Sequence, residues 1–175
     1  DRTQDICREF DNVEVVVHAY PGNQAEQFNW ALDHCAIDTE WVLRLDADEY
    51  LYPELVVELE EKLPQLPKSV SALSLSRARC FMGRRLRHGI VNSVRLVRLF
   101  RKGMARSAQR LMEEQIAVLG GEVVEMEHQF VDDNRLPIGA FVRKHDNYAS
   151  REAALLLCKE YGLGADSVTQ GASLS

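Results

Sequence analysis

The sequence predicts an α/β protein in which a mostly parallel sheet is flanked by helices. Three strand-like segments alternate with two helical segments between Val13 and Ser76, an order typical of parallel strands joined by crossover helices. The length of 175 residues fits one domain with a sizeable core. No apolar run approaches the roughly 20 residues that a membrane-spanning helix needs.

The first half of the chain accounts for these five elements. Val13–Val17 is rich in β-branched residues and is bounded by turn-forming residues, so it predicts a strand. Gln24–Ile37 has its apolar residues on one stripe, which predicts a helix. The second strand is expected at Trp41–Leu45. A proline at an early helical position then predicts a helix over Glu54–Leu63, and Val70–Ser76 is the third strand.

The second half of the chain is less regular. Val94–Phe100 alternates loosely and predicts a strand, and Glu122–Glu127 predicts another after a Gly-Gly turn. The segment from Pro137 to Tyr161 has a helical pattern. We expect one domain over residues 1–163 and a flexible tail over residues 164–175, because the tail is made of small and polar residues.

Three acidic residues follow the hydrophobic strand Trp41–Leu45, namely Asp46, Asp48 and Glu49. In open α/β sheets, ligands bind beyond the carboxyl ends of the strands. Two carboxylates one residue apart can both face a hard cation such as Mg²⁺ or Mn²⁺, and these ions commonly bridge a protein to substrate phosphates. The pattern allows a metal site, and it equally allows an acidic loop in which an Asp caps the next helix.

Basic residues are concentrated in one part of the chain. The segment from Arg77 to Met112 contains ten Arg, one Lys and no acid, so it carries +11 in a chain of net charge −6, and the remainder carries −17. Such a block indicates an anionic ligand or an anionic surface nearby. The overall acidic balance is not typical of nucleic-acid binding.

Several segments match short motifs in a fixed order. WVLRLDADEYL resembles a metal- and nucleotide-binding segment, and HAYPGNQAEQFNWALDHC resembles a stretch with a Gln-Arg-Asn-x-Ala-Leu core. CFMGRRLRHGI, VRLFRKGMAR and RLMEEQI resemble three further elements, and the chain closes with Asp-x-Asn-Arg and Lys-His-x-x-Tyr-Ala motifs. The set resembles family 2 glycosyltransferases, which have the GT-A fold, and is most similar to bacterial enzymes of exopolysaccharide or lipopolysaccharide assembly.

The resemblance implies roles for five acidic residues. It places Asp48 on the metal directly, with Asp46 nearer the ribose or a metal-bound water. The ion would act as a Lewis acid toward the leaving diphosphate. An inverting transfer needs a base that takes a proton from the acceptor hydroxyl, and the resemblance implies Glu114 for this role, with Glu113 second. Glu49 is either a contact of the donor sugar or a solvated loop acid.

The basic block and one histidine also receive roles. The basic residues expected at the site, against diphosphate or an anionic acceptor, are Arg84, Arg85, Arg87 and His88, because Arg forks suit phosphate oxygens. Arg95–Arg106 is expected mainly at a surface, as one solvated face of a strand that rests on an anionic membrane leaflet. His128 is a candidate third metal ligand, although a lone His more often has a structural role. The other matching positions are Lys144, His145 and Tyr148.

The chain departs from the family pattern at three places. Phe28 stands where the family often has a basic residue, and Gln115 replaces a frequent His. A GT-A domain normally begins with a strand, a helix and a second strand that cradle the base and ribose, and these would precede Asp1. We therefore expect a partial GT-A domain in which the N-terminal nucleotide-binding strands are missing.

The function implied is a metal-dependent, inverting glycosyltransferase of the hexosyltransferase class. It would move a sugar from a nucleotide-diphosphate donor, UDP-linked, to a saccharide or lipid-linked acceptor in bacterial cell-surface polysaccharide synthesis. Four Cys without a CxxC pair predict reduced thiols in the cytoplasm, with peripheral contact at the inner membrane and no nucleic-acid partner.

Two other functions remain open at this point. One is a non-enzymatic module that binds anionic polymer or membrane through the Arg77–Arg110 block. The other is a phosphohydrolase of the haloacid dehalogenase type, which also has a strand ending in Asp-x-Asp. That family typically has Thr or Val two residues after the second Asp, whereas this chain has Tyr50 at that position.

Overall fold

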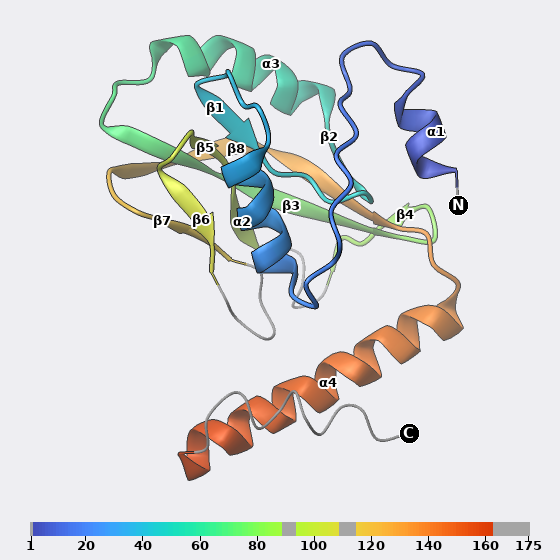
Figure 1. Cartoon of the computed structure of the whole chain (residues 1–175). Helices are drawn as coiled ribbons and strands as arrows, with labels where there is room; N and C mark the ends of the chain where they lie inside the picture. The colour runs from blue at the N-terminus through green and yellow to red at the C-terminus, as the bar shows by residue number, and fades with distance from the viewer. Residues whose placement is uncertain (1, 89–93, 109–114, 163–175) are drawn as a thin grey trace.

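The computed structural model describes residues 2–88, 94–108 and 115–162, which form a mixed sheet flanked by helices (Figure 1). The main sheet has the strand order β1-β5-β3-β8-β2, with β4 paired to β3. Its strands are β1 (Trp41–Leu43), β2 (Glu49–Leu51), β3 (Val70–Phe81), β4 (Arg84–Arg85), β5 (Arg95–Arg101) and β8 (Glu122–Asn134). A second, two-stranded sheet pairs β6 (Ala105–Ser107) with β7 (Ile116–Val118).

Strand directions in the main sheet are mixed. β3 and β8 are parallel, β5 is antiparallel to both β1 and β3, and β2 is antiparallel to β8. The strands β1, β3 and β8 therefore share one direction, and their carboxyl ends lie at the same edge of the sheet. The expected α/β class is confirmed, but direct parallel pairing among the described strands is restricted to β3 with β8. β5 returns antiparallel because the connection from β3 contains no crossover helix among its described residues.

Helices cover both faces of the sheet. α2 (Gln24–His34) and α3 (Pro53–Lys62) pack on opposite faces because successive side chains of β3 point in opposite directions. Leu73 joins the core under α3 with Leu55 and Phe130, whereas Ala72 joins a second core with Phe100, next to α2. The chain also contains α1 (Thr3–Cys7), the short 3₁₀ helix η1 (Leu63–Gln65) and α4 (Ile138–Tyr161).

α4 leaves the end of β8 and extends across one side of the molecule (Figure 1). Its first turns are held to the sheet by Phe141, whose ring centroid lies 4.7 Å from that of Phe81 in β3. Gly162 follows the helix with a φ of +65°, the left-handed conformation that commonly ends helices. No helix in the described part of the chain is long and apolar enough to cross a membrane.

Several predicted elements differ from the observed ones. Val13–Val17 is not a strand: no described strand pairs with it, and the Val17 side chain is 70% exposed. β-branched composition favours a strand only where a neighbouring strand and a buried face are present. The strand expected at Glu122–Glu127 continues to Asn134, because its second half pairs with the end of β3. The tail expected over residues 164–175 lies outside the described residues.

Candidate functional site

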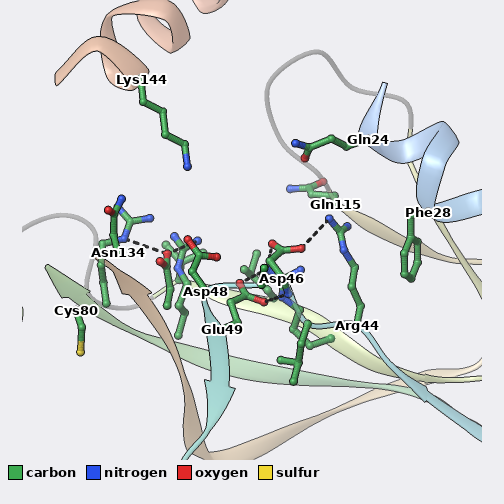
Figure 2. A pocket seen from close by; sticks show the side chains of 18 of the residues that line it. Gln24, Phe28, Arg44, Asp46, Asp48, Glu49, Cys80, Gln115, Asn134 and Lys144 are labelled. Atoms are coloured by element: carbon green, nitrogen blue, oxygen red, sulfur yellow. Dashed lines mark hydrogen bonds and ion pairs between the residues drawn. The ribbon is translucent and has the colours of Figure 1, made fainter. Parts of the chain in front are cut away.

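An open cleft of about 1420 Å³ lies where the carboxyl ends of β1, β3 and β8 meet (Figure 2). Its walls come from α2, the loop after β1, the end of β3, the start of β5, the end of β8 and the first half of α4. Asp46 and Asp48 both line it. The predicted position of a ligand site beyond the strand ends therefore agrees with the cleft.

The loop that carries the two aspartates is fixed by backbone hydrogen bonds. The N–H of Glu49 donates to the carbonyl of Asp46 at 2.9 Å, which closes a turn around Asp48. The N–H of Asp133 in β8 donates to the carbonyl of Asp48 at 2.8 Å. These bonds connect the loop to the sheet on the side of β8. Asp46 and Asp48 are both exposed, so the loop presents its carboxylates to the cleft while its backbone is held.

A buried arginine organises the carboxylates further. Arg98 in β5 is 6% exposed at its side chain, and its Nη2 donates to Glu49 at 2.5 Å and lies 3.4 Å from Asp46. The other Glu49 oxygen accepts the backbone N–H of Asp46 at 3.0 Å. Nη2 of Arg44 lies 3.5 Å from the other carboxylate oxygen of Asp46, Oδ1. Asp46 is thus partly neutralised by two guanidinium groups, whereas Asp48 has no ion pair with a described residue.

Glu49 is a structural residue of this loop. Its side chain is only 3% exposed. Burial raises the pKa of Glu49, and the hydrogen bond from Asp46 and the charge of Arg98 offset that effect only in part. Glu49 lines the cleft, but its carboxylate is buried and bonded to Arg98, so the expected solvated loop acid is wrong, and the contact with a donor sugar stays a prediction.

The carboxylates fit a divalent cation that also binds substrate. Among the described residues, no group of three or more His, Cys, Asp or Glu is placed to hold a metal. Asp46 and Asp48 alone can supply oxygen ligands from one short loop. Mg²⁺ is usually bound through one or two carboxylates together with water and substrate phosphates. The donor set therefore fits an ion that arrives with a phosphate-bearing ligand, and it does not form an all-protein cage.

His128 does not join the two aspartates. Its Nδ1 lies 2.9 Å from Oε2 of Glu58 in α3, and it does not line the cleft. Glu58 also accepts the backbone N–H groups of Glu127 and His128, both at 2.9 Å, and Nζ of Lys62 at 2.7 Å. The candidate third metal ligand is thus part of a polar connection between α3 and β8.

The expected basic contacts lie outside the cleft. Arg84 and Arg85 form β4, a short exposed strand after the turn at Met82 and Gly83, both with positive φ. Arg85 donates to Gln129 and lies 5.9 Å from the ring centroid of Tyr52. Neither arginine lines the cleft, and Arg87 and His88 do not line it either. The structure therefore does not bring these four residues to Asp46 and Asp48.

The predicted solvated face of Arg95–Arg106 is wrong for two of its four arginines, Arg98 and Arg101, whereas the side chains of Arg95 and Arg106 are 39% and 43% exposed. Arg98 is buried, as described above, and the Arg101 guanidinium lies 4.4 Å from the ring centroid of Trp41 and donates to the carbonyl of Val70. Arg106 forms a two-bond ion pair with Asp33. Alternate side chains of a strand face opposite sides, so arginines three residues apart cannot share one face.

Charged residues that have no individual role in the sequence analysis also line the cleft. Besides Arg44, they include Arg77 and Arg79 of β3 and Asp132 of β8. The alternation of Arg77 and Arg79 was a usable signal, because residues two apart in a strand face the same side. Asp132 lies outside the predicted strand, but it is the first residue of the Asp-x-Asn-Arg motif, which was the signal available for it.

Of the family-matched residues, Lys144, His145 and Tyr148 do line the cleft, from α4. Figure 2 shows Lys144 extending from α4 toward the sheet. The guanidinium of Arg44 lies 5.0 Å from the ring centroid of Phe28, so a cation is present beside the position where the family often has a basic residue. Glu113 and Glu114 lie outside the described residues; Gln115, which follows them, lines the cleft.

The fold and the cleft together define a class of protein. A helix-flanked mixed sheet with an Asp-x-Asp loop at its carboxyl edge, facing an open cleft, is consistent with a GT-A-like glycosyltransferase domain. The family model described as Glycosyl transferase family 2 matches residues 1–117, so the chain belongs to that family. No curated protein matches the chain. The family membership favours a glycosyltransferase over the dehalogenase-type and non-enzymatic alternatives.

Proposed function

We propose that the chain transfers a sugar from a nucleotide-diphosphate donor, UDP-linked, with a divalent cation bound at Asp46 and Asp48. The observation that carries this proposal is the fixed loop after β1, which presents two exposed carboxylates to a large cleft at the strand ends. A Mg²⁺ or Mn²⁺ ion bound there would supply a Lewis acid that neutralises the leaving diphosphate.

The two aspartates have different surroundings, and we assign them different roles. Asp48 has no ion pair with a described residue, so its full charge is available to a cation. Asp46 shares its charge with Arg44 and Arg98, which suits an outer contact with ribose or a metal-bound water. For the base that takes the acceptor proton we keep Glu114, with Glu113 second.

The remaining parts of the proposal concern the acceptor and the location. We propose a saccharide or lipid-linked acceptor in bacterial cell-surface polysaccharide synthesis, on the cytoplasmic side of the inner membrane. Peripheral membrane contact would use the exposed arginines of the β3–β4 hairpin, Arg84, Arg85 and Arg87, because Arg98, Arg101 and Arg106 are engaged within the protein. Co-sedimentation with vesicles containing anionic lipid tests this contact.

The donor site is tested by Asp48→Asn, with Asp38→Asn as the matched control. Asp38 is an exposed acid before β1 and does not line the cleft. Calorimetry of the full-length protein with UDP and Mn²⁺ should show at least about tenfold weaker binding for Asp48→Asn, because interactions with a charged group are worth roughly 1.5–3 kcal/mol. Asp38→Asn should bind like the unmodified protein. Equal, Mn²⁺-dependent UDP binding in all three proteins would refute the role of Asp48.

A further inference from the structure

Two arginines in the cleft share a single carboxylate. Nη1 of Arg77 lies 3.7 Å and Nε of Arg79 lies 3.5 Å from the same oxygen, Oδ2 of Asp132. The side chains of the three residues are only 17%, 21% and 18% exposed. Nε of Arg77 is buried and has no hydrogen-bond partner among the described residues. The three side chains therefore carry a net positive charge in a partly desolvated place.

The geometry directs this excess charge into the cleft. Arg77 and Arg79 are two residues apart in β3, so both point to the face that lines the cleft. Burial and the neighbouring charge of Arg79 lower the pKa of Arg77, which indicates that the two guanidinium groups repel each other. An anion placed between them would relieve this repulsion.

A third cation lines the same cleft from α4. Lys144 has one described contact, with the ring of Tyr148 at 5.8 Å, and no ion pair with a described carboxylate. By contrast, Arg98 is already paired with Glu49 and Asp46. The cleft therefore has, besides Asp46 and Asp48, cationic side chains from β3 and from α4.

We propose that Arg77, Arg79 and Lys144 form an anion subsite that holds a phosphate or carboxylate group of the acceptor. Guanidinium forks bind the oxygens of both groups in pairs, and an ammonium adds a mobile charge. The proposal rests on the proposed glycosyl transfer. The donor diphosphate is assigned to the metal at Asp46 and Asp48, so these three cations are left for the second substrate. A neutral acceptor would leave this charge uncompensated.

Inorganic phosphate is the probe for the subsite, titrated by ³¹P NMR into the whole protein. Arg79→Gln and Lys144→Gln should each weaken phosphate binding about tenfold, since each removes a charge-assisted contact. Lys68→Gln, which changes an exposed lysine outside the cleft, should leave it unchanged. Circular dichroism establishes that each variant is folded. Unchanged phosphate binding in either cleft variant would overturn the subsite.

A gain of affinity gives an independent test. Asp132→Asn removes the carboxylate that both arginines share, so phosphate should bind several-fold more tightly, an effect that general damage to the fold would not produce. Weaker or equal binding in this variant would count against the subsite.

Saturating UDP with Mn²⁺ separates an acceptor subsite from the donor site. Phosphate should still bind when UDP is bound; displacement by UDP would show that the three cations belong to the donor site and would overturn the proposal. Absence of UDP binding would instead refute the proposed donor site, while the variants of Arg79, Lys144 and Asp132 would still decide the anion subsite.

Discussion

The carboxylate of Glu58 should make the stability of the fold depend on pH. Its side chain is 5% exposed. Although burial by itself raises its pKa, hydrogen bonds from Glu127, Lys62 and His128 bring the pKa from 4.5 to about 2. This difference corresponds to roughly 3 kcal/mol of unfolding free energy. The contribution is fully present above pH 4.5, where the unfolded chain is also ionised, and is lost as the pH falls toward 2.

Glu58→Gln should therefore lower the unfolding free energy by roughly 3 kcal/mol at pH 7 and by much less at pH 3, where the unmodified protein has lost about 2 kcal/mol of this contribution. Urea denaturation followed by circular dichroism at pH 7, 5 and 3 measures both values. Glu127→Gln is the matched control, because its side chain is 79% exposed, and it should change stability by less than about 0.5 kcal/mol. A difference between Glu58→Gln and the unmodified protein that stays the same at pH 7 and pH 3 would refute the reasoning.

Two further predictions concern buried groups. Arg98→Met leaves the buried Glu49 without its partner, so it should lower the unfolding free energy, measured by urea denaturation, by roughly 3–5 kcal/mol. The double variant with Glu49→Leu should recover most of this loss. An unchanged urea midpoint for Arg98→Met would contradict the buried pair. Gly121→Ala should cost more than about 1 kcal/mol, because Gly121 has a φ of +82° and a Cβ there would meet the side chain of Ser71. Gly120→Ala meets nothing within 4 Å and should be nearly neutral, so equal losses for the two glycine variants would argue against this account.

Local patterns were enough to predict much of the fold. The apolar stripe of Gln24–Ile37 and the proline before Glu54 predict both helices that cover the sheet, and the first of them ends at His34 in the structure. Amphipathic spacing and proline position act within one segment. The acids after β1 were likewise predicted at a cleft. Local patterns do not show which strands pair with one another. The composition of Val13–Val17 predicts a strand, although no described strand pairs with this segment.

Only the tertiary structure shows where the charged side chains lie and what they contact. His128 is a candidate third metal ligand by its sequence position, yet it contacts Glu58, 70 residues away, once α3 packs on β8. Arg84 and Arg85 belong to the family-like segment CFMGRRLRHGI but lie outside the cleft. Arg77 and Arg79 precede that segment, and they line the cleft. No local pattern indicates which of several arginines a distant carboxylate will neutralise.

The sequence by itself determined that two carboxylates follow a hydrophobic strand and that the cationic charge is concentrated in one part of the chain. These are properties of neighbouring residues and need no long-range contact. Only the tertiary structure decided which charges are paired within the protein, as Arg98 is with Glu49, and which remain in excess in the cleft, as at Arg77 and Arg79. The reason is physical: an ion pair forms between groups that strand pairing brings within a few ångströms, whatever their separation along the chain.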